Sequence, residues 1–253
     1  MIRNKIRTLV THWIQRQFDQ VLYYYVQKRK NAYILQIGAN DGKTLDPLYK
    51  LIRLPQVKAV LVEAVPFIYN KLCLTHKEND RVTPLNKVVV PTKTTDVVPF
   101  YYFEERVGIK YKNEYSWWGS LDEKYMSKYT SNNPELAQLL TRKMLSCVSI
   151  HELIQLTGFP EINVLHTDVE GLDAELINAL NFDIISIDII LFEHYHTNQS
   201  VYLTLLAKLK QYGYKCYSHG FDTICIQQKA AIKTTILDII YHIRPSLLKR
   251  PTS

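Results

Sequence analysis

Glycine is scarce in this chain of 253 residues, which has only eight glycines and no G-x-G-x-x-G spacing. That absence disfavours a dinucleotide-binding oxidoreductase, although such an enzyme stays open as an alternative. No apolar run approaches the roughly 20 residues that a membrane-spanning helix needs, and no signal-peptide core is visible. We therefore expect a cytoplasmic protein.

Cysteine is also sparse, with four residues that form no C-x-x-C pair and no metal-type spacing. Disulfides are rare in reducing compartments, and isolated cysteines in apolar runs behave as small hydrophobic residues. The sequence therefore predicts reduced, buried thiols at Cys73, Cys147, Cys216 and Cys225.

Positive charge is concentrated at the two ends of the chain. The net charge of +7 divides into +6 for residues 1–30, +4 for residues 229–253, and −3 for residues 31–228. A nucleic-acid-binding protein usually carries its basic patch on the folded body. The charge pattern therefore disfavours a nucleic-acid partner.

An amphipathic helix is predicted over residues 2–27, where apolar residues recur at helical spacing. We favour a helix that packs across the sheet or against a partner subunit, which would make a homo-oligomer. The alternative is peripheral membrane contact through the basic ends, because basic and aromatic residues share the helix. Residues 229–253 are expected to form a short helix and a basic tail.

Strands alternate with helices through residues 31–228, which predicts an α/β domain with a doubly wound, mostly parallel sheet. Residues 81–90 are expected to form one strand, and residues 43–53 one helix. Residues 104–146 form an aromatic-rich insertion, either a lid or substrate wall or two short helices with a surface connection.

Polar residues follow the predicted strands where each one ends: at 38–42, at Glu63, at 168–171 and at 193–196. Ligands of open α/β sheets bind at the carboxyl ends of the strands. The glycine-flanked turn at 38–42 suits close approach of a ligand to the backbone. Glu63 ends the next strand, where a carboxylate accepts hydrogen bonds from a ribose hydroxyl pair.

Acids and histidines at the last two of these strand ends are the candidate catalytic groups. One of them is expected to act as general base on a substrate hydroxyl. Alternatively, Asp168, Glu193 and a histidine hold a divalent ion, which we favour less. The structural alternative is that the histidines only satisfy backbone groups at a strand end. The candidates are Asp168, Glu170, Glu193, His194 and His196.

Four motifs resemble the FkbM family of S-adenosylmethionine-dependent methyltransferases. They are Gln36–Gly42 with Asp46–Tyr49, Leu61–Pro66, Thr167–Asp173 and Leu191–His196, in the family's order across about residues 31–228. The resemblance implies the class I methyltransferase fold, a seven-stranded sheet that ends in an antiparallel hairpin. It also implies methyl transfer, usually to a hydroxyl of a sugar or natural product, so the expected acceptor is a glycan or small molecule.

The resemblance also implies a set of contacts to the methyl donor. The turn at 38–42 would wrap the methionine part and Glu63 would hold the ribose, with residues 168–170 beside the transfer site. Two departures are a glutamine at 36, where many class I enzymes carry an acid, and an alanine at 64, where the family often has proline. A non-catalytic scaffold that kept the fold is the remaining alternative. The expected donor contacts are Gln36, Gly38, Ala39, Asn40, Asp41, Gly42, Glu63, Ala64, Asn86 and Asp168.

Overall fold

The computed structural model describes residues 16–106, 119–131, 133–235 and 237–239. Residues 16–27 are helical. The further elements are β1 (Ala32–Ile37), α2 (Tyr49–Ile52), β2 (Val57–Val62), α3 (Pro66–His76), β3 (Val82–Leu85), β4 (Val88–Val90), β5 (Val97–Phe103), β6 (Gly119–Ser120), α5 (Glu123–Thr130), α6 (Pro134–Ala137), β7 (Leu140–Ser149), α7 (Ile150–Thr157), β8 (Ile162–Thr167), α8 (Asp173–Ala179), β9 (Ile187–Glu193), α9 (Gln199–Gln211), β10 (Tyr214–His219), β11 (Asp222–Gln227) and the 3-10 turn η1 (Gln228–Ala230).

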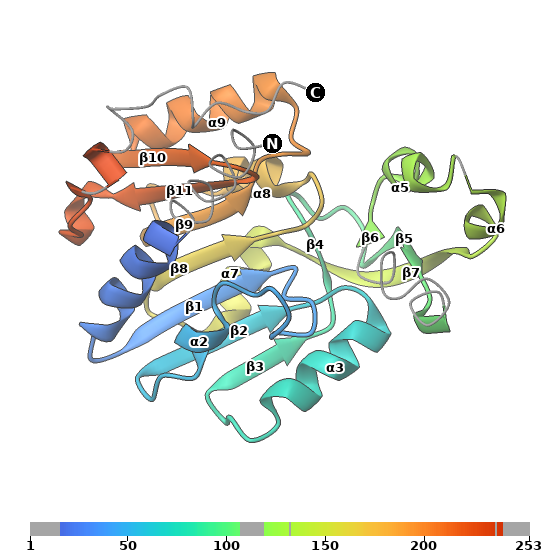
Figure 1. Ribbon diagram of the computed structural model, residues 1–253, viewed down its shortest axis with the longest axis horizontal. Coiled ribbons are helices and arrows are strands. Elements are labelled where there is room, and N and C mark those ends of the chain that lie inside the picture. Colours follow the sequence, from blue (N-terminus) through green and yellow to red (C-terminus); the bar gives the residue numbers. More distant parts are fainter. Residues whose placement is uncertain (1–15, 107–118, 132, 236, 240–253) are drawn as a thin grey trace, which may run out of the picture.

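The main sheet has seven strands in the order β10-β11-β9-β8-β1-β2-β3 (Figure 1). Strands β9, β8, β1, β2 and β3 run parallel, while β11 is antiparallel to both of its neighbours. The prediction of a mostly parallel seven-stranded sheet with a closing antiparallel hairpin is confirmed. Strand order reverses between β1 and β8, the point where open sheets of this type bind ligands.

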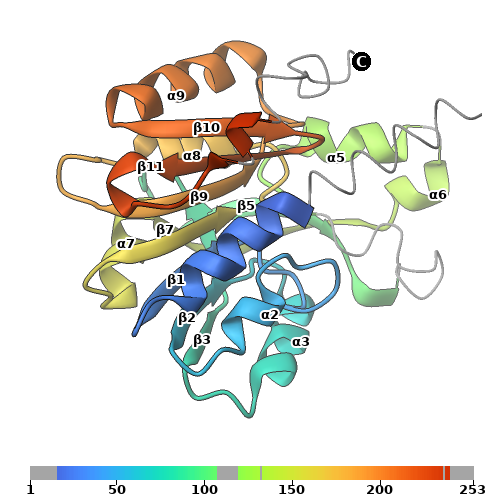
Figure 2. The same cartoon turned by 60° about the vertical axis from the view of Figure 1, so that its left-hand side comes forward.

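Helices cover both faces of this sheet. The helix at 16–27 and α2 lie on one face, and α7, α8 and α9 lie on the other (Figure 2). Adjacent strand residues alternate between the two cores, as Ile34 and Leu35 of β1 do. The sheet is therefore buried on both sides, which agrees with the near-continuous apolar runs in its strands.

The helix at 16–27 contributes directly to the core. Phe18, Leu22 and Val26 are buried against β1 and its neighbours. Packing across the sheet, the interpretation that the sequence favours, is therefore what the described part of this helix does. Residues 1–15 lie outside the described residues. No helix in the described ranges is long and apolar enough to cross a membrane.

Replacing Phe18 with alanine is expected to lower the free energy of unfolding by about 3 to 5 kcal/mol. The side chain is 1% exposed, so its removal leaves a cavity between helix and sheet. Urea denaturation measures the change. The matched control is Tyr23→Ala on the same helix, because Tyr23 is 40% exposed. Equal losses in the two variants would show that the helix is not anchored through this face.

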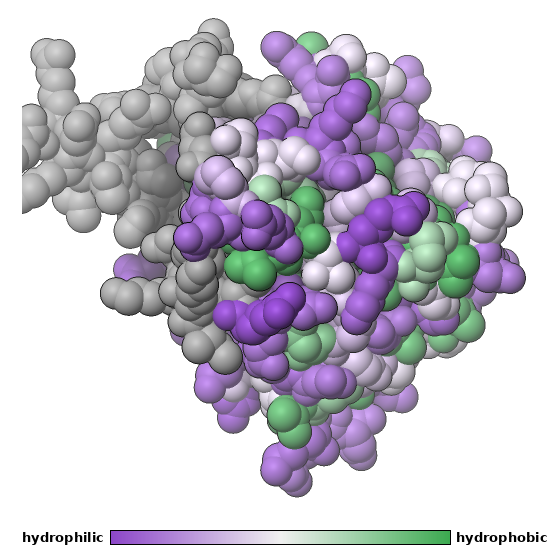
Figure 3. Space-filling view, turned by 90° about the vertical axis from the view of Figure 1, so that its right-hand side faces the viewer, coloured by the Kyte–Doolittle hydropathy of each residue, from purple (hydrophilic) through white to green (hydrophobic). Residues whose placement is uncertain are grey.

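A second, four-stranded sheet in the order β4-β7-β5-β6 stands beside the main one (Figure 1). The single strand predicted over 81–90 is wrong, because the chain leaves the main sheet after β3 and β4 pairs with β7 instead. Strand β5, which the apolar run at 97–103 forms, pairs antiparallel with β7 and with β6. Figure 3 looks onto this end of the molecule, where apolar side chains form small areas broken by hydrophilic ones.

The predicted helix over 43–53 is also wrong, because only Tyr49–Ile52 is helical. The Asp41 carboxylate accepts hydrogen bonds from the backbone N–H groups of Lys43 and Thr44. Leu45 then takes a left-handed conformation, with φ of 57°. Local side-chain hydrogen bonds of this kind compete with helix formation, so the turn extends several residues further than the apolar spacing indicates.

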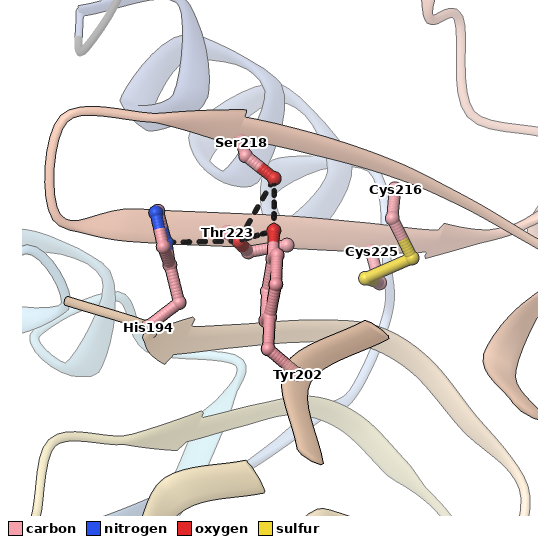
Figure 4. The surroundings of a disulfide bond; sticks show 6 residues. All are labelled: His194, Tyr202, Cys216, Ser218, Thr223 and Cys225. Atoms are coloured by element: carbon pink, nitrogen blue, oxygen red, sulfur yellow. Dashed lines mark hydrogen bonds between the residues drawn. A yellow bond between two sulfur atoms is a disulfide. The ribbon is translucent and has the colours of Figure 1, made fainter. Parts of the chain in front are cut away.

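The prediction that all four cysteines are reduced and buried holds only for Cys147. Cys216 and Cys225 form a disulfide between β10 and β11 (Figure 4). These residues face each other directly in the antiparallel register, with their Cα atoms 4.0 Å apart. Cys73 and Cys147 are free thiols, of which only Cys147 is buried.

Candidate functional site

A cavity of about 410 Å³ lies at the carboxyl ends of β1, β2 and β8, between the main sheet and the second sheet. Its volume falls within the range of small-molecule sites, about 300 to 1,000 Å³. The wall on the side of the second sheet comes from β4 and β5 and, within the insertion, from β6 and α5. Predicted site residues that line it are Gly38, Asn40, Glu63, Ala64, Asp168, Glu170 and His196.

The turn after β1 brings its backbone against the loop after β8. Gly38 has φ of +80°, and a Cβ atom built there would lie 1.9 Å from the backbone oxygen of Asp168. Only glycine satisfies both constraints. Gly42 has φ of +69°, and its Cβ would meet the Leu72 side chain at 2.5 Å. The glycine-flanked turn predicted at 38–42 is therefore packed against the β8 loop at Gly38 and against α3 at Gly42.

Glu63 follows β2 and is buried at the edge of the cavity. Its carboxylate accepts hydrogen bonds from the backbone N–H of Asn40 at 2.9 Å and of Val65 at 2.8 Å. Burial raises the pKa of Glu63 to about 7, against the lowering effect of these hydrogen bonds. Each carboxylate oxygen keeps a further lone pair, which can accept from a ribose hydroxyl. Asn86 supports this strand end by donating to the backbone oxygens of Glu63 and Ala64.

The affinity for S-adenosylmethionine, the donor implied by the family resemblance, is expected to rise as pH increases through about 7. Below the pKa of about 7, Glu63 carries a proton that a hydroxyl pair cannot displace without cost. Above it, the ionised carboxylate accepts both hydrogen bonds. Calorimetric titration at pH 6, 7 and 8 measures the effect. The control is a Glu63→Gln variant, which keeps the other acids of the cavity. If this variant showed the same pH dependence as the wild type, the role of Glu63 would be contradicted.

The loop after β8 is folded by a buried acid. The Asp173 carboxylate accepts from the backbone N–H groups of Val169 and Gly171, at 3.3 Å in each case. Burial raises the pKa of Asp173 to about 7. This arrangement leaves Asp168 and Glu170 lining the cavity. Asp168 is exposed to the cavity and enclosed by other acids, and desolvation followed by repulsion from Asp173 and Glu170 raises its pKa well above the usual value.

The end of β9 contributes Glu193 and His196 to the same region. The His196 Nε2 atom lies 3.8 Å from Glu170 Oε2 and 4.0 Å from Glu193 Oε1. Burial and the neighbouring acids raise the pKa of Glu193 to about 9. These three residues form the one group in the described ranges whose ligand atoms are close enough together to hold a metal ion. They differ from the predicted set, which used Asp168 in place of Glu170.

Tyr125 of α5 is the residue that the sequence analysis missed. Its phenol donates a hydrogen bond to Glu170, and its ring meets the His196 ring edge-on at 5.2 Å. Lys128, one helical turn later, also lines the cavity. The sequence does carry a signal for this helix face: Tyr125 and Lys128 lie three positions apart in a helix that Asp122 caps, so they share one side of it. Insertion helix α5 therefore forms part of the wall, while α6 takes part in a separate small core.

His194 does not line the cavity. Its side chain is buried, with Nδ1 3.0 Å from Thr223 Oγ1 and the ring stacked on Tyr202 (Figure 4). This position favours the structural interpretation for His194. Gln36 is also buried away from the lining, and its Oε1 has no hydrogen-bond partner among the described residues. The other predicted site residues outside the lining are Ala39, Asp41, Gly42, Asn86 and Glu193.

The strand order, the glycine turn after β1 and the carboxylate after β2 define the class I methyltransferase architecture. A family model described as the methyltransferase FkbM domain matches residues 36–216, and the chain belongs to this family. It is an S-adenosylmethionine-dependent methyltransferase. The alternatives of an oxidoreductase and of a non-catalytic scaffold are therefore wrong.

Solved structures of methyltransferases are similar to this chain at low identity. Precorrin-6y C5,15-methyltransferase from Geobacter metallireducens is 9% identical, with a TM-score of 0.41, over 83% of this chain and 88% of its own. Aeropyrum pernix fibrillarin, solved with natively bound S-adenosyl-L-methionine, is 13% identical, with a TM-score of 0.39, over 78% and 67%. No curated protein sequence matches this chain.

The residues present fit S-adenosylmethionine. A side chain at position 38 would fill the space between the turn and the β8 loop, whereas glycine leaves the backbone there open to the cavity. Glu63 has lone pairs available for the ribose hydroxyls beside that turn. When bound, the cofactor supplies a methyl group on a positively charged sulfur, and the surrounding carboxylates favour a cation.

Proposed function

We propose that the enzyme transfers the methyl group to a hydroxyl oxygen of a sugar, a glycan or a small polyhydroxylated metabolite. The observation that carries this proposal is a single cavity that joins Gly38, Asn40 and Glu63 to Asp168, Glu170 and His196. Carboxylates and imidazole nitrogens accept hydrogen bonds from hydroxyl groups, and a pair of them can hold a vicinal diol.

The reaction needs alignment and the removal of one proton. The acceptor oxygen attacks the methyl carbon, the new C–O bond forms, and the C–S bond breaks with its electron pair remaining on sulfur. We assign the proton to Asp168, because its carboxylate is exposed to the cavity beside the turn at Gly38 and can accept a proton from a hydroxyl bound there. Tyr125, which belongs to α5 on the insertion side of the cavity, orients Glu170 by donating a hydrogen bond to it.

The test is methyl transfer from isotope-labelled S-adenosylmethionine to a panel of acceptors, analysed by mass spectrometry with mapping of the methylated atom. The panel holds free sugars, sugar nucleotides, oligosaccharides, phenols, amines and thiols. We expect a methyl ether on a sugar or polyol hydroxyl. A methylated nitrogen, sulfur or phenol as the main product would overturn the proposal.

Peripheral membrane contact stays a prediction. Residues 1–15 and 240–253, which carry much of the terminal positive charge, lie outside the described residues. Pelleting with vesicles that contain anionic lipid, compared between the full chain and a variant with Arg3, Lys5 and Arg7 changed to glutamine, tests it. Equal recovery of both proteins in the pellet would contradict a role for these charges.

A further inference from the structure

Three side chains at one end of the cavity, those of Glu170, Glu193 and His196, each bring a possible ligand atom close to the other two. Glu170 and His196 line the cavity, and Glu193 lies beside them at the end of β9. The His196 Nε2 atom is 3.8 Å and 4.0 Å from its two carboxylate neighbours. Both distances are too long for a hydrogen bond.

The distances between these three ligand atoms suit a bound metal ion. The three ligand atoms all lie within 4.8 Å of one another. For a triangle with sides of 3.8, 4.0 and at most 4.8 Å, the point equidistant from its corners lies at most about 2.5 Å from each. Bonds from divalent cations to oxygen and nitrogen measure about 2.0 to 2.6 Å. We propose that Glu170, Glu193 and His196 bind a divalent cation of the Mn²⁺ type.

The surroundings of the ligands agree with this assignment. The second oxygen of the Glu193 carboxylate, Oε2, is buried and has no hydrogen-bond partner among the described residues. The phenol of Tyr125 donates to Glu170, which fixes that carboxylate from the insertion side. Two carboxylates favour Mg²⁺ and Mn²⁺, while an imidazole favours later transition metals, so the mixed set suits Mn²⁺ best.

The cation deepens the proposed function, on which this part of the inference rests. Three ligands from one side leave the positions toward the cavity for water or substrate. A hydroxyl of the acceptor takes one of them, and coordination lowers its pKa. The hydroxyl proton passes to Asp168, and the oxygen attacks the methyl carbon as above. The cation would also position a diol through two adjacent oxygens.

Cation binding is tested on the full chain after removal of metals with EDTA. Titration with MnCl₂, followed by the electron paramagnetic resonance signal of free Mn²⁺, is expected to give one saturable site per chain. Glu193→Gln removes one ligand charge at nearly constant shape and is expected to raise the dissociation constant at least about tenfold. The control Glu123→Gln changes an acid on α5 outside the cavity lining and is expected to bind as the wild type does.

Two results would overturn the site: no saturable binding by the wild type, or equal affinity in Glu193→Gln. Retained affinity of Glu193→Gln for S-adenosylmethionine shows that this variant is folded. His196→Gln serves as the second ligand variant and is expected to weaken Mn²⁺ binding similarly. Donor binding in EDTA tests the methyltransferase assignment separately, since it needs no cation. Turnover that EDTA leaves unchanged would overturn the catalytic role of the cation alone.

Discussion

Replacing Gly38 with alanine is expected to abolish binding of S-adenosylmethionine and to lower the free energy of unfolding by more than about 3 kcal/mol. The new Cβ would lie 1.9 Å from the backbone oxygen of Asp168. A backbone atom in a sheet-anchored loop cannot move aside as a flexible side chain can. The β1 turn and the β8 loop would have to separate. This separation would distort the part of the cavity that Gly38, Asn40 and Glu63 line, where we expect the methyl donor to bind. Calorimetry and urea denaturation measure the two effects.

Gly158→Ala is the matched control for that variant. Gly158 ends α7 with φ of +63°, similar to that of Gly38, but a Cβ there would meet nothing within 4 Å. Only the cost of a left-handed alanine remains, about 1 to 2 kcal/mol, and donor binding should be unchanged. The difference between the two variants isolates the close approach from the conformational cost. Similar stability losses in both would contradict the packing of the two loops.

Replacing Asp168 with asparagine is expected to lower kcat by about 10² to 10⁴-fold while the affinity for S-adenosylmethionine changes little. Asparagine keeps the shape of the side chain and cannot accept the acceptor proton. The Asp168 backbone, which donates to Ile37 O at 2.9 Å, is unaffected. Single-turnover kinetics with an acceptor found by the panel measures the chemical step, and calorimetry measures donor affinity.

The opposite result is equally informative, because the sequence analysis placed Asp168 in both the donor and the catalytic sets. A large loss of donor affinity with unchanged single-turnover rate would assign Asp168 to the cofactor and contradict its role as base. Asp80→Asn is the control for removal of a negative charge. Its carboxylate is 94% exposed, and no change is expected in either quantity.

The main sheet could be predicted from the sequence because its signals are local. Apolar strands such as Val57–Val62 and apolar-faced helices such as Gln199–Gln211 alternate along the chain, and alternation itself implies parallel pairing. The second sheet could not be predicted, since the pairing of β4 with β7 joins segments almost 60 residues apart. No sequence pattern near Asn86 indicates that the chain leaves the main sheet between β3 and β4. The Cys216–Cys225 bond was missed for a different reason: the two residues are 9 positions apart, but only the exact hairpin register shows that they face each other.

The residues expected to bind the methyl donor were easier to predict than those expected to face the acceptor. Gly38 and Glu63 sit directly at strand ends, where topology alone dictates proximity. The two histidines after β9 point in different directions. His196 lines the cavity, whereas His194 is buried against Thr223 of the hairpin. Tyr125 comes from an insertion without a clear period, so its contact with Glu170 depends on how that insertion packs.

The position of β9 in the sheet sets an order in which the two halves of the site are completed during synthesis. Strands β1 and β2, which end at the expected donor contacts Gly38 and Glu63, are neighbours in both sequence and space. Strand β9 is enclosed only when β11, the last strand among the described residues, pairs with it and places Asp222 opposite Glu193. A nascent chain therefore contains the segments expected to bind the donor, up to the β8 loop that packs on Gly38, before the strand that encloses β9 has been made. Until β11 pairs with β9, the strand end that carries Glu193 lies at an open edge of the sheet.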